Sequence, residues 1–436
     1  MTILNNWIYI DGGEVSQIVD GKRLGPENST RASKVLTATL AIDLSTSWLA
    51  SDVKILEIER PDNKNDAPPP MDIGAVWNDA SGQSFYVWGG IAPYGEGVDR
   101  IASSGVWKFT PDSNDRSTGA WSLETVSNPA VLSNTRKSFQ GGFVTVPKTN
   151  TGYWLGGYAQ VGRTEDPSSK GADGEAAGLM SFNMATSEWK NDTASDLVPA
   201  GRSRGAAGVW LPRFGANGLV TFVGGFGVVS GFREFTNLTF FDPVTRKSYS
   251  QTATGDAPSP RKDFCAVAVE SPRGGHEVFV FGGANPQDRT DEAYDDVYVL
   301  TLPGFQWFKV DDTFGGPRSS HSCVVAGQRQ MISIGGTSSN NFNNRGTTWD
   351  EPDKFGQGIG IFDMTALTWS TKGEYDAYAK KYASPDVVNE WYQTTGDLSK
   401  RQWSSSEVQA LFVKDDTTSK WQTILGVLQM VWKKLT

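Results

Sequence analysis

Short apolar stretches that end in two adjacent glycines recur along the whole chain. The clearest copy is the run 330–334, which is followed by Gly335 and Gly336. The other copies end at Gly12–Gly13, Gly89–Gly90, Gly156–Gly157, Gly224–Gly225 and Gly282–Gly283. Short apolar runs bounded by turn-forming residues are typical of β-strands. Six copies therefore predict six similar β units.

The sequence pattern predicts four strands in each unit, most clearly between residues 317 and 369. The predicted strands cover 318–326, 330–334 and 358–363, and a fourth opens at Thr368. A tight turn joins the third and fourth strands, and an aromatic residue follows it. The turns and their aromatic residues are Asp43 with Trp48, Phe109 with Trp121, Asn183 with Trp189, Asp242 with Tyr249, and Leu300 with Trp307. We expect these aromatic side chains to pack between neighbouring sheets.

The predicted first strands align with one another, and five of the six begin with arginine. Their first residues are Met71, Arg136, Arg202, Arg261, Arg318 and Arg401. The N-terminus enters at a second strand, 7–13, without a first strand before it. The segment 401–412 reads as a first strand that no double glycine follows. We therefore expect the C-terminal strand to complete the N-terminal blade.

The double glycine, followed at a distance by an aromatic residue and tryptophan, resembles kelch repeats over about Trp7 to Phe412. This resemblance implies an all-β, six-bladed β-propeller spanning 1–412. The repeats are longer than kelch repeats usually are, mainly between the second and third strands, at 14–37, 91–105, 158–178 and 337–357. Strands alternate in direction within a blade, so these loops share one face with the arginines. We expect the ligand site on that face.

The tail, 413–436, contains the pattern of a short amphipathic helix. Its apolar face comprises Trp421, Ile424, Leu425, Leu428 and Val431. The helix is too short to span a bilayer, which needs ~20 apolar residues. We expect it to dock on the propeller; the alternatives are a homodimer contact, a membrane surface or a disordered tail.

Composition supports the all-β class and excludes one kind of partner. The chain has 48 glycines and 16 tryptophans, and helix-period apolar patterns are nearly absent. Its net charge is −9, and it has no long block of like charges. This charge pattern gives no electrostatic surface for DNA or RNA, so we expect no nucleic-acid partner.

Cysteines and glycosylation patterns bear on the compartment. Cys265 and Cys323 lie at offsets of opposite parity on neighbouring first strands, which favours two buried thiols over a disulfide. Asn28, Asn191 and Asn237 open acceptor patterns for N-glycans. These patterns permit secretion or a secretory-pathway location. No leader precedes Trp7 in this sequence, and a cytoplasmic location also stays open.

The number and positions of the histidines argue against a metal cofactor. His276 and His321 are the two histidines, and strand alternation places them on opposite faces of the propeller. Kelch-like copper oxidases that resemble galactose oxidase need two imidazoles together with tyrosines. Iron-dependent plant specifier proteins use Glu, Asp and His spaced four apart, whereas Pro272 and Pro317 occupy the spaced positions here. We expect neither a metal nor another cofactor.

The loop-rich face supplies the candidate site. The candidate catalytic residues are Arg261, Arg318, His321 and Arg401. The candidate binding residues are Arg136, Phe139, Tyr158, Arg204, Phe226, Phe264, Trp349 and Trp403. Such a set suits an apolar ligand with a carbonyl or phenolate oxygen that a guanidinium can polarise. Kelch arginines at strand starts can instead tie together backbone carbonyls of adjacent blades.

Two functions follow from these expectations. The segment 382–388, Trp403 and the segment 408–412 resemble fungal kelch-like proteins of the secretory pathway, among them hetero-Diels–Alderases. That resemblance implies a cofactor-free pericyclase that couples a quinone methide to a humulene-type terpene, with arginine and His321 polarising the carbonyl. The alternative is a non-catalytic kelch module that binds protein or glycan at the same face.

Overall fold

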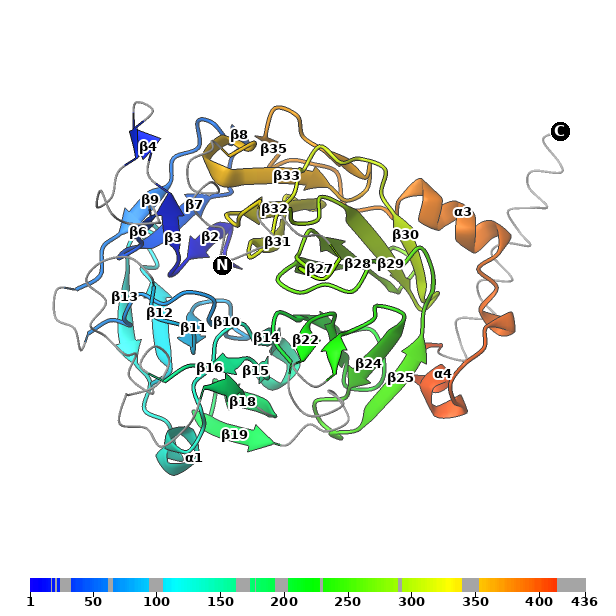
Figure 1. Cartoon of the computed structure of the whole chain (residues 1–436), viewed down its shortest axis with the longest axis horizontal. Helices are drawn as coiled ribbons and strands as arrows, with labels where there is room; N and C mark the ends of the chain where they lie inside the picture. The colour runs from blue at the N-terminus through cyan, green and yellow to red at the C-terminus, as the bar shows by residue number, and fades with distance from the viewer. Residues whose placement is uncertain are drawn as a thin grey trace.

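The computed structural model describes residues 1–16, 18–19, 22–23, 33–61, 66–93, 105–161, 173–176, 178–192, 203–227, 230–288, 292–338 and 353–413. In this part of the chain, six sheets of at least four strands are arranged in a ring (Figure 1). Each sheet is one antiparallel blade. The expected all-β class and the six-bladed β-propeller are confirmed.

The first three blades follow one another along the chain. Blade 1 consists of β1 (Thr2–Leu4), β2 (Trp7–Ile10), β7 (Thr39–Asp43) and β9 (Leu56–Ile58). Blade 2 consists of β10 (Ala75–Asn78), β11 (Phe85–Trp88), β12 (Trp107–Pro111) and β13 (Gly119–Leu123). Blade 3 consists of β14 (Gly142–Val146), β15 (Thr151–Leu155), β18 (Leu179–Asn183) and β19 (Glu188–Asp192).

The second half of the ring repeats this order. Blade 4 consists of β20 (Ala207–Leu211), β21 (Leu219–Val223), β24 (Asn237–Phe241) and β25 (Ser248–Thr252). Blade 5 consists of β27 (Cys265–Glu270), β28 (His276–Phe281), β29 (Val297–Leu302), β30 (Gln306–Lys309) and the added parallel strand β26 (Thr254–Gly255). Blade 6 consists of β31 (Ser322–Ala326), β32 (Gln330–Ile334), β33 (Ile359–Asp363) and β34 (Thr368–Trp369).

Shorter strands and helices lie outside the six blade sheets. The two-stranded sheets pair β3 (Glu14–Ser16) with β6 (Ser33–Val35), β4 (Ile18–Val19) with β5 (Lys22–Arg23), β16 (Tyr158–Ala159) with β17 (Gly174–Glu175), β22 (Phe226–Gly227) with β23 (Gly231–Phe232), and β8 (Trp48–Leu49) with β35 (Glu374–Tyr375). The helices are α1 (Pro129–Ser133), α3 (Asp386–Thr394), α4 (Ser406–Phe412) and the 3-10 turns η1 (Pro147–Thr149), η2 (Gly356–Gly358) and η3 (Leu398–Lys400).

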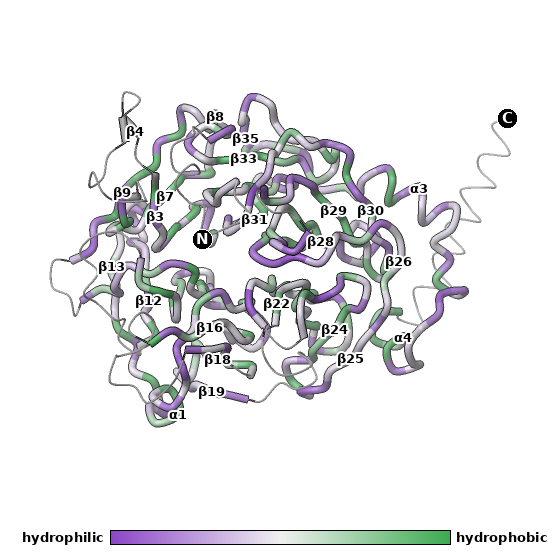
Figure 2. Tube along the Cα trace, viewed as in Figure 1, coloured by the Kyte–Doolittle hydropathy of each residue, from purple (hydrophilic) through white to green (hydrophobic). Residues whose placement is uncertain are grey.

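The hydrophobic core is divided among the interfaces between blades. Each of the six clusters of buried apolar side chains joins two adjacent blades. Strands β28 and β29 are buried at every position, because neighbouring blades cover both faces of blade 5. Hydropathy follows this division, with hydrophobic strand segments around the ring and a hydrophilic turn beside β28 (Figure 2).

The expected aromatic residues pack in the interfaces between blades; five of them belong to fourth strands, whereas Trp48 lies in β8 and not in β9, the fourth strand of blade 1. Four of them are buried, namely Trp121, Trp189, Trp307 and Trp369. Trp48 and Tyr249 are half-buried. Side-chain caps hold the turns before five of these aromatic residues. Asn183 Oδ1, for example, accepts hydrogen bonds from the backbone N–H groups of Ala185 at 3.0 Å and Thr186 at 2.9 Å.

A double glycine follows the second strand of every blade. All twelve glycines have positive φ, from 57° at Gly224 to 107° at Gly13, a region that other residues enter only with strain. In blades 2 to 5, the N–H of the second glycine donates to a carbonyl of the following blade, as Gly283 does to Arg318 at 2.8 Å. The repeated feature that predicted the fold therefore also joins the blades through their backbones.

The expected closure by a C-terminal strand is wrong. Blade 1 has its own innermost strand, because β1 pairs with β2 in the register Ile3 to Ile8. The ring closes through packing of Ile8 and Ile42 against Ile332 and Ile361, and through pairing of β35 with β8. Strand β1 has only three residues, too few to form a recognisable pattern in the sequence.

The segment after β35 runs along the outside of the ring instead of forming a blade (Figure 1). Residues 406–412 form helix α4, whose Val408 and Phe412 pack into the cluster between blades 4 and 5. Helix α3 buries Val388 in the cluster between blades 5 and 6. The amphipathic helix expected after Phe412 lies outside the described residues, so its docking and the homodimer contact remain predictions.

Candidate functional site

A circle of backbone hydrogen bonds marks the face where the inner strands begin, which we call the upper face. The residues before these strands all have positive φ; they are Ile73, Gln140, Gly205, Asp263 and Ser320. In blades 3 to 6, the N–H of this residue donates to the equivalent carbonyl one blade earlier, as Asp263 does to Gly205 at 2.9 Å and Ser320 does to Asp263 at 2.7 Å. This circle fixes the structural alignment of the blades.

The alignment corrects the expected set of equivalent arginines. The positions two residues before the circle are Met71, Ser138, Ser203, Arg261 and Arg318. Ser138 and Ser203, rather than Arg136 and Arg202, thus occupy the arginine position in blades 3 and 4. Their roles agree, because Ser138 donates to the Gly156 carbonyl at 3.0 Å in the way that Arg261 donates to Gly282 at 3.1 Å. Loop residues before the strand obscured this alignment in the sequence.

The guanidinium groups of Arg261 and Arg318 are engaged in ion pairs and hydrogen bonds within the propeller. Arg261 has no exposed surface, forms an ion pair with Asp296 and lies 3.6 Å from the centroid of the Tyr294 ring. Arg318 pairs with Asp353 at 2.6 Å and donates to the Gly335 carbonyl at 2.5 Å. Neither guanidinium is available to polarise a substrate, so the structure assigns both of them to architecture.

Arg401 and Trp403 do not lie on the upper face. The Arg401 guanidinium donates to the carbonyl of Gly304, in the turn between β29 and β30 of blade 5, and at 2.8 Å to that of Thr252, at the end of the outer strand β25 of blade 4. Trp403 packs 5.8 Å from the Phe305 ring in the same region. Both residues were misplaced because the segment 401–412 is not a first strand.

His321 and Phe264 occupy equivalent positions next to the circle, and both are buried. Phe264 is 6% exposed and packs 5.3 Å from Phe235 in the cluster between blades 4 and 5. His321 is 7% exposed and packs 4.9 Å from Phe281. Burial, with a contribution from Arg318, lowers the pKa of His321 to about 3, so the ring is neutral. Neither side chain is placed to contact a ligand on the surface.

A buried polar network joins three blades at the start of their inner strands. Gln140 Nε2 donates to both carboxylate oxygens of Asp263, at 2.7 and 2.8 Å, and Lys262 forms an ion pair with the same carboxylate. Gly205 of blade 4 lies between them, and a Cβ there would come within 2.7 Å of Asp263 Oδ1. This network could not be predicted from the sequence, because its members lie in three different repeats.

A partly exposed group of one cation and four aromatic rings lies on the upper face, in blades 3 and 4. We call Phe139, Tyr158, Arg204, Phe226 and Phe232 the Arg204 cluster. The guanidinium carbon lies 5.3 Å from the centroids of both Tyr158 and Phe226. Phe139 lies 5.9 Å from Tyr158, and Phe232 lies 4.8 Å from Phe226. All five side chains are half-buried.

Local strand pairing positions this cluster. Short bridges pair Phe139 with Tyr158 and Arg204 with Phe226, in each case joining the approach to the inner strand with the residue after a double glycine. The structure thus brings together four of the expected binding residues, whereas Phe232 was not expected. Arg136 is half-buried and already has a partner, and Arg202 and Trp349 lie outside the described residues.

Two hollows in the described part of the chain lie away from the Arg204 cluster. An open hollow of about 920 Å³ is formed by the turn 268–274 together with Arg213, Gln328, Lys381 and Tyr382. It lies on the lower face, where the first strands end. A small hollow of about 40 Å³ lies beside Met71, Trp88 and Lys137. Neither hollow is the expected pocket among the rim arginines.

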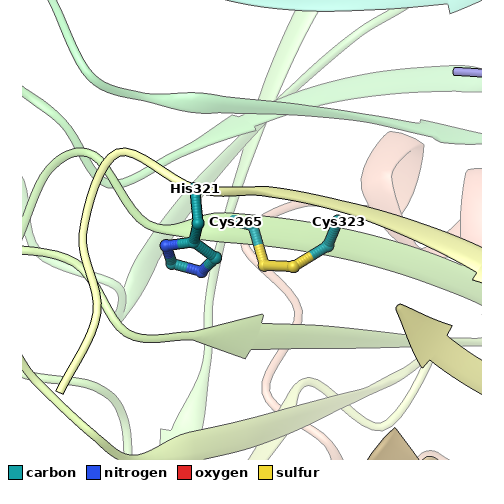
Figure 3. A group of neighbouring side chains, drawn as sticks. All are labelled: Cys265, His321 and Cys323. Atoms are coloured by element: carbon teal, nitrogen blue, oxygen red, sulfur yellow. A yellow bond between two sulfur atoms is a disulfide. The ribbon is translucent and has the colours of Figure 1, made fainter. Parts of the chain in front are cut away.

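The expectation of two free thiols is wrong, because Cys265 and Cys323 form a disulfide (Figure 3). Cysteines of opposite parity could not meet if the same faces of the two strands were in contact. In a propeller, however, the contact joins opposite faces of adjacent blades. Opposite parity therefore brings the side chains of β27 and β31 together, with Cα atoms 5.7 Å apart.

His276 lies at the opposite end of its blade from the upper face, as expected, and supplies a pH-dependent contribution to stability. Burial lowers its pKa from 6.5 to about 4. Folding therefore favours the neutral ring, and this stabilisation is complete above pH ~6.5 and declines as the pH falls towards 4. Gln at this position can still accept from the backbone N–H of Arg213.

We expect His276→Gln to make the free energy of unfolding less sensitive to acid. Between pH 6.5 and 4.5, the wild type should lose up to ~1.4 kcal/mol per pH unit more than the variant. Urea unfolding at pH 7, 6 and 5 measures this difference. Parallel pH profiles for the two proteins would contradict the assigned neutral state.

Two further expectations concern the surface. Asn191 and Asn237 are exposed, as a glycan acceptor must be, whereas Asn28 lies outside the described residues. Use of these three sites remains a prediction. None of the helices in the described ranges has the length and apolar character needed to cross a membrane.

Six blades with double-glycine corners define a kelch-type β-propeller, and comparisons with known proteins agree. Residues 217–425 match the KLHDC2/KLHL20/DRC7 Kelch-repeats domain. A "Kelch repeat-containing protein" of Arthroderma benhamiae is 27% identical over 409 residues, which cover 86% of this chain and 56% of the relative. The chain thus spans little more than half the length of that relative. The structure of YjhT aligns with a TM-score of 0.51 at 14% identity, covering 84% of this chain and 95% of that one, and supports the fold alone.

Proposed function

We propose that this propeller is a recognition module that binds an acidic peptide segment of a protein partner at the Arg204 cluster. One observation carries the proposal. Arg204 presents a guanidinium held between two rings from adjacent blades, and no ion pair within the described part of the chain includes it. A cation fixed in this way is pre-organised to receive a carboxylate.

The surroundings of Arg204 support the same ligand class. Its buried Nε–H has no hydrogen-bond partner among the described residues, so part of the donor capacity is unused. The half-exposed rings of Phe139 and Phe232 extend the surface on either side of the cation. A carboxylate followed by an apolar side chain matches this arrangement, because the guanidinium meets the charge and the rings cover the apolar group.

Selection from a random peptide library on the immobilised protein tests the proposal. Peptides bound by the wild type should be enriched in Asp or Glu beside an apolar residue. Arg204→Gln should raise the dissociation constants of these peptides at least roughly tenfold, because a charge-assisted hydrogen bond contributes ~1.5–3 kcal/mol.

Arg213→Gln is the matched control for that experiment. Arg213 is also an arginine of blade 4, its side chain is 56% exposed, and it lies on the lower face. This variant should bind the selected peptides like the wild type. If the wild type enriches no acidic peptides, or if Arg204→Gln binds them with unchanged affinity, the proposal fails.

The hetero-Diels–Alder hypothesis is a second proposal for the same cluster, and it now depends on one cation. Among the candidate catalytic arginines, Arg261, Arg318 and Arg401 are assigned to structural contacts, and Arg204 is a described arginine of the upper face that has no ion-pair partner among the described residues. It could donate to the quinone methide oxygen while Tyr158 and Phe226 contact the terpene. Equal rate and product ratio for a generated quinone methide and humulene, with and without protein, would rule this function out.

We also propose a secretory-pathway or secreted location. The disulfide between Cys265 and Cys323 supports it, because such bonds persist mainly in oxidising compartments. The intact mass after expression in a glycosylating host tests this location. A mass equal to that of the bare chain would argue against it.

A further inference from the structure

Three potential metal ligands converge where blades 5 and 6 meet. The sulfur atoms of Cys265 and Cys323 and a ring nitrogen of His321 all lie within 4.8 Å of one another. Figure 3 shows the imidazole beside the disulfide that joins the two cysteines. The cysteines come from the innermost strands β27 and β31, and the histidine immediately precedes β31. The set is distinct from the Arg204 cluster.

The histidine in this group has no evident structural purpose. Both of its ring nitrogens are buried and have no hydrogen-bond partner in the described part of the chain. The Phe281 carbonyl lies near the ring but does not meet it with hydrogen-bond geometry. Burying polar nitrogens in this way costs stability. The fold does not require them, because the equivalent position in blade 5 is Phe264.

We propose that, when the disulfide is reduced, Cys265, Cys323 and His321 bind a zinc ion. Two thiolates and one imidazole are a ligand set that suits Zn²⁺. Zn–S bonds of about 2.3 Å at a tetrahedral angle separate two sulfur atoms by about 3.8 Å, and the three ligand atoms already lie within 4.8 Å of one another. Rotation of the cysteine side chains can open the required space, and a water molecule would complete four-coordination.

Reduction of the disulfide can be written as a balanced reaction with a phosphine as the reductant. The phosphine takes an oxygen atom from water and becomes a phosphine oxide, while two electrons and two protons convert the disulfide to two thiols. Zinc then displaces both thiol protons and binds two thiolates together with the neutral imidazole. The same residues therefore crosslink blades 5 and 6 through a disulfide under oxidising conditions and through a metal ion under reducing conditions.

The inner-strand surface provides a route to the site. Cys323 is half-buried, and its neighbour Ser322 is exposed on β31. We expect reductant and ion to approach from the partly exposed side of Cys323. Cys265, by contrast, is 5% exposed, so we expect reduction to begin by attack on the Cys323 sulfur.

Cobalt titration tests the site in the full chain. After reduction by a water-soluble phosphine and anaerobic removal of the reductant, Co²⁺ should bind with one-to-one stoichiometry. It should give the thiolate charge-transfer and visible bands of tetrahedral cobalt, and Zn²⁺ should displace it. Oxidised protein should show none of these bands. Zinc should also raise the melting temperature of the reduced protein and leave that of the oxidised protein unchanged.

Two histidine variants serve as the test and the control for zinc binding. His321→Phe copies the ring found at the equivalent position of blade 5 and should keep the fold and the disulfide, while its zinc dissociation constant after reduction rises at least roughly tenfold. His276→Gln alters the other histidine and should bind zinc like the wild type. The proposal is overturned if the reduced wild type does not bind cobalt, or if His321→Phe binds zinc equally well. Loss of the native circular dichroism spectrum on reduction, without recovery on adding zinc, would overturn it too.

Discussion

Replacing Gly283 with alanine is expected to destabilise the propeller by roughly 3 kcal/mol or more. Gly283 has φ of 100°, and a Cβ there would lie 2.8 Å from Phe264 Cβ and 2.9 Å from the Lys262 carbonyl oxygen. Neither neighbour can move freely, because Phe264 lies in the core and Lys262 pairs with Ala284. The cost therefore combines ~1–3 kcal/mol of backbone strain with ~1–3 kcal/mol of overpacking.

Gly274→Ala is the control that separates these two contributions. Gly274 also has positive φ, 86°, in the same blade, but nothing lies within 4 Å of the position of its Cβ. This variant should lose only the strain contribution, ~1 kcal/mol. Urea unfolding of the wild type and the two variants at one pH measures the difference. Equal losses would contradict the overpacking assigned to the crowded corner at Gly283.

The double glycine shows why the fold could be predicted from the sequence. A backbone that turns with positive φ at a crowded corner selects glycine, so the constraint appears directly as a residue type. The capped turns, such as the one at Asn183, are visible for the same reason. Each of these patterns is local, and its repetition along the chain allowed the six-bladed ring to be predicted from the sequence.

Other features depended on contacts between repeats, which a linear sequence does not display. The Arg261 side chain is satisfied by Asp296, and the Gln140 side chain reaches Asp263 across an intervening blade. The disulfide was missed because opposite faces of adjacent blades meet, a relation that counting along single strands does not reveal.

The candidate site was predicted in part for a similar reason. Residues adjacent to a double glycine, such as Tyr158 and Phe226, could be placed on the upper face from the repeat alone. Arg401 could not be placed in this way, because the segment that it opens contains helix α4 outside the ring and is not a strand of a blade. The sequence thus indicated a face and its aromatic residues, but not which arginine remains available there.

The buried pair between Arg261 and Asp296 carries the second large expected effect. Removing one partner of a buried ion pair leaves an uncompensated charge and typically costs ~3–5 kcal/mol. Arg261 has no exposed side-chain surface, and the Asp296 side chain is 8% exposed. Asp296→Ala is therefore expected to destabilise the protein by that amount, measured by urea unfolding at pH 7.

An exposed pair and a double variant distinguish loss of a charge partner from general damage. In the pair of Arg213 with Glu270, 2.7 Å apart, the side chains are 56% and 49% exposed, so Glu270→Ala should cost less than ~1 kcal/mol. Combining Arg261→Met with Asp296→Ala removes both charges, and the double variant should be more stable than Asp296→Ala alone. A double variant that loses the sum of the two single losses would show that Arg261 does not depend on its charge partner, and the structural role assigned to this arginine would then fail.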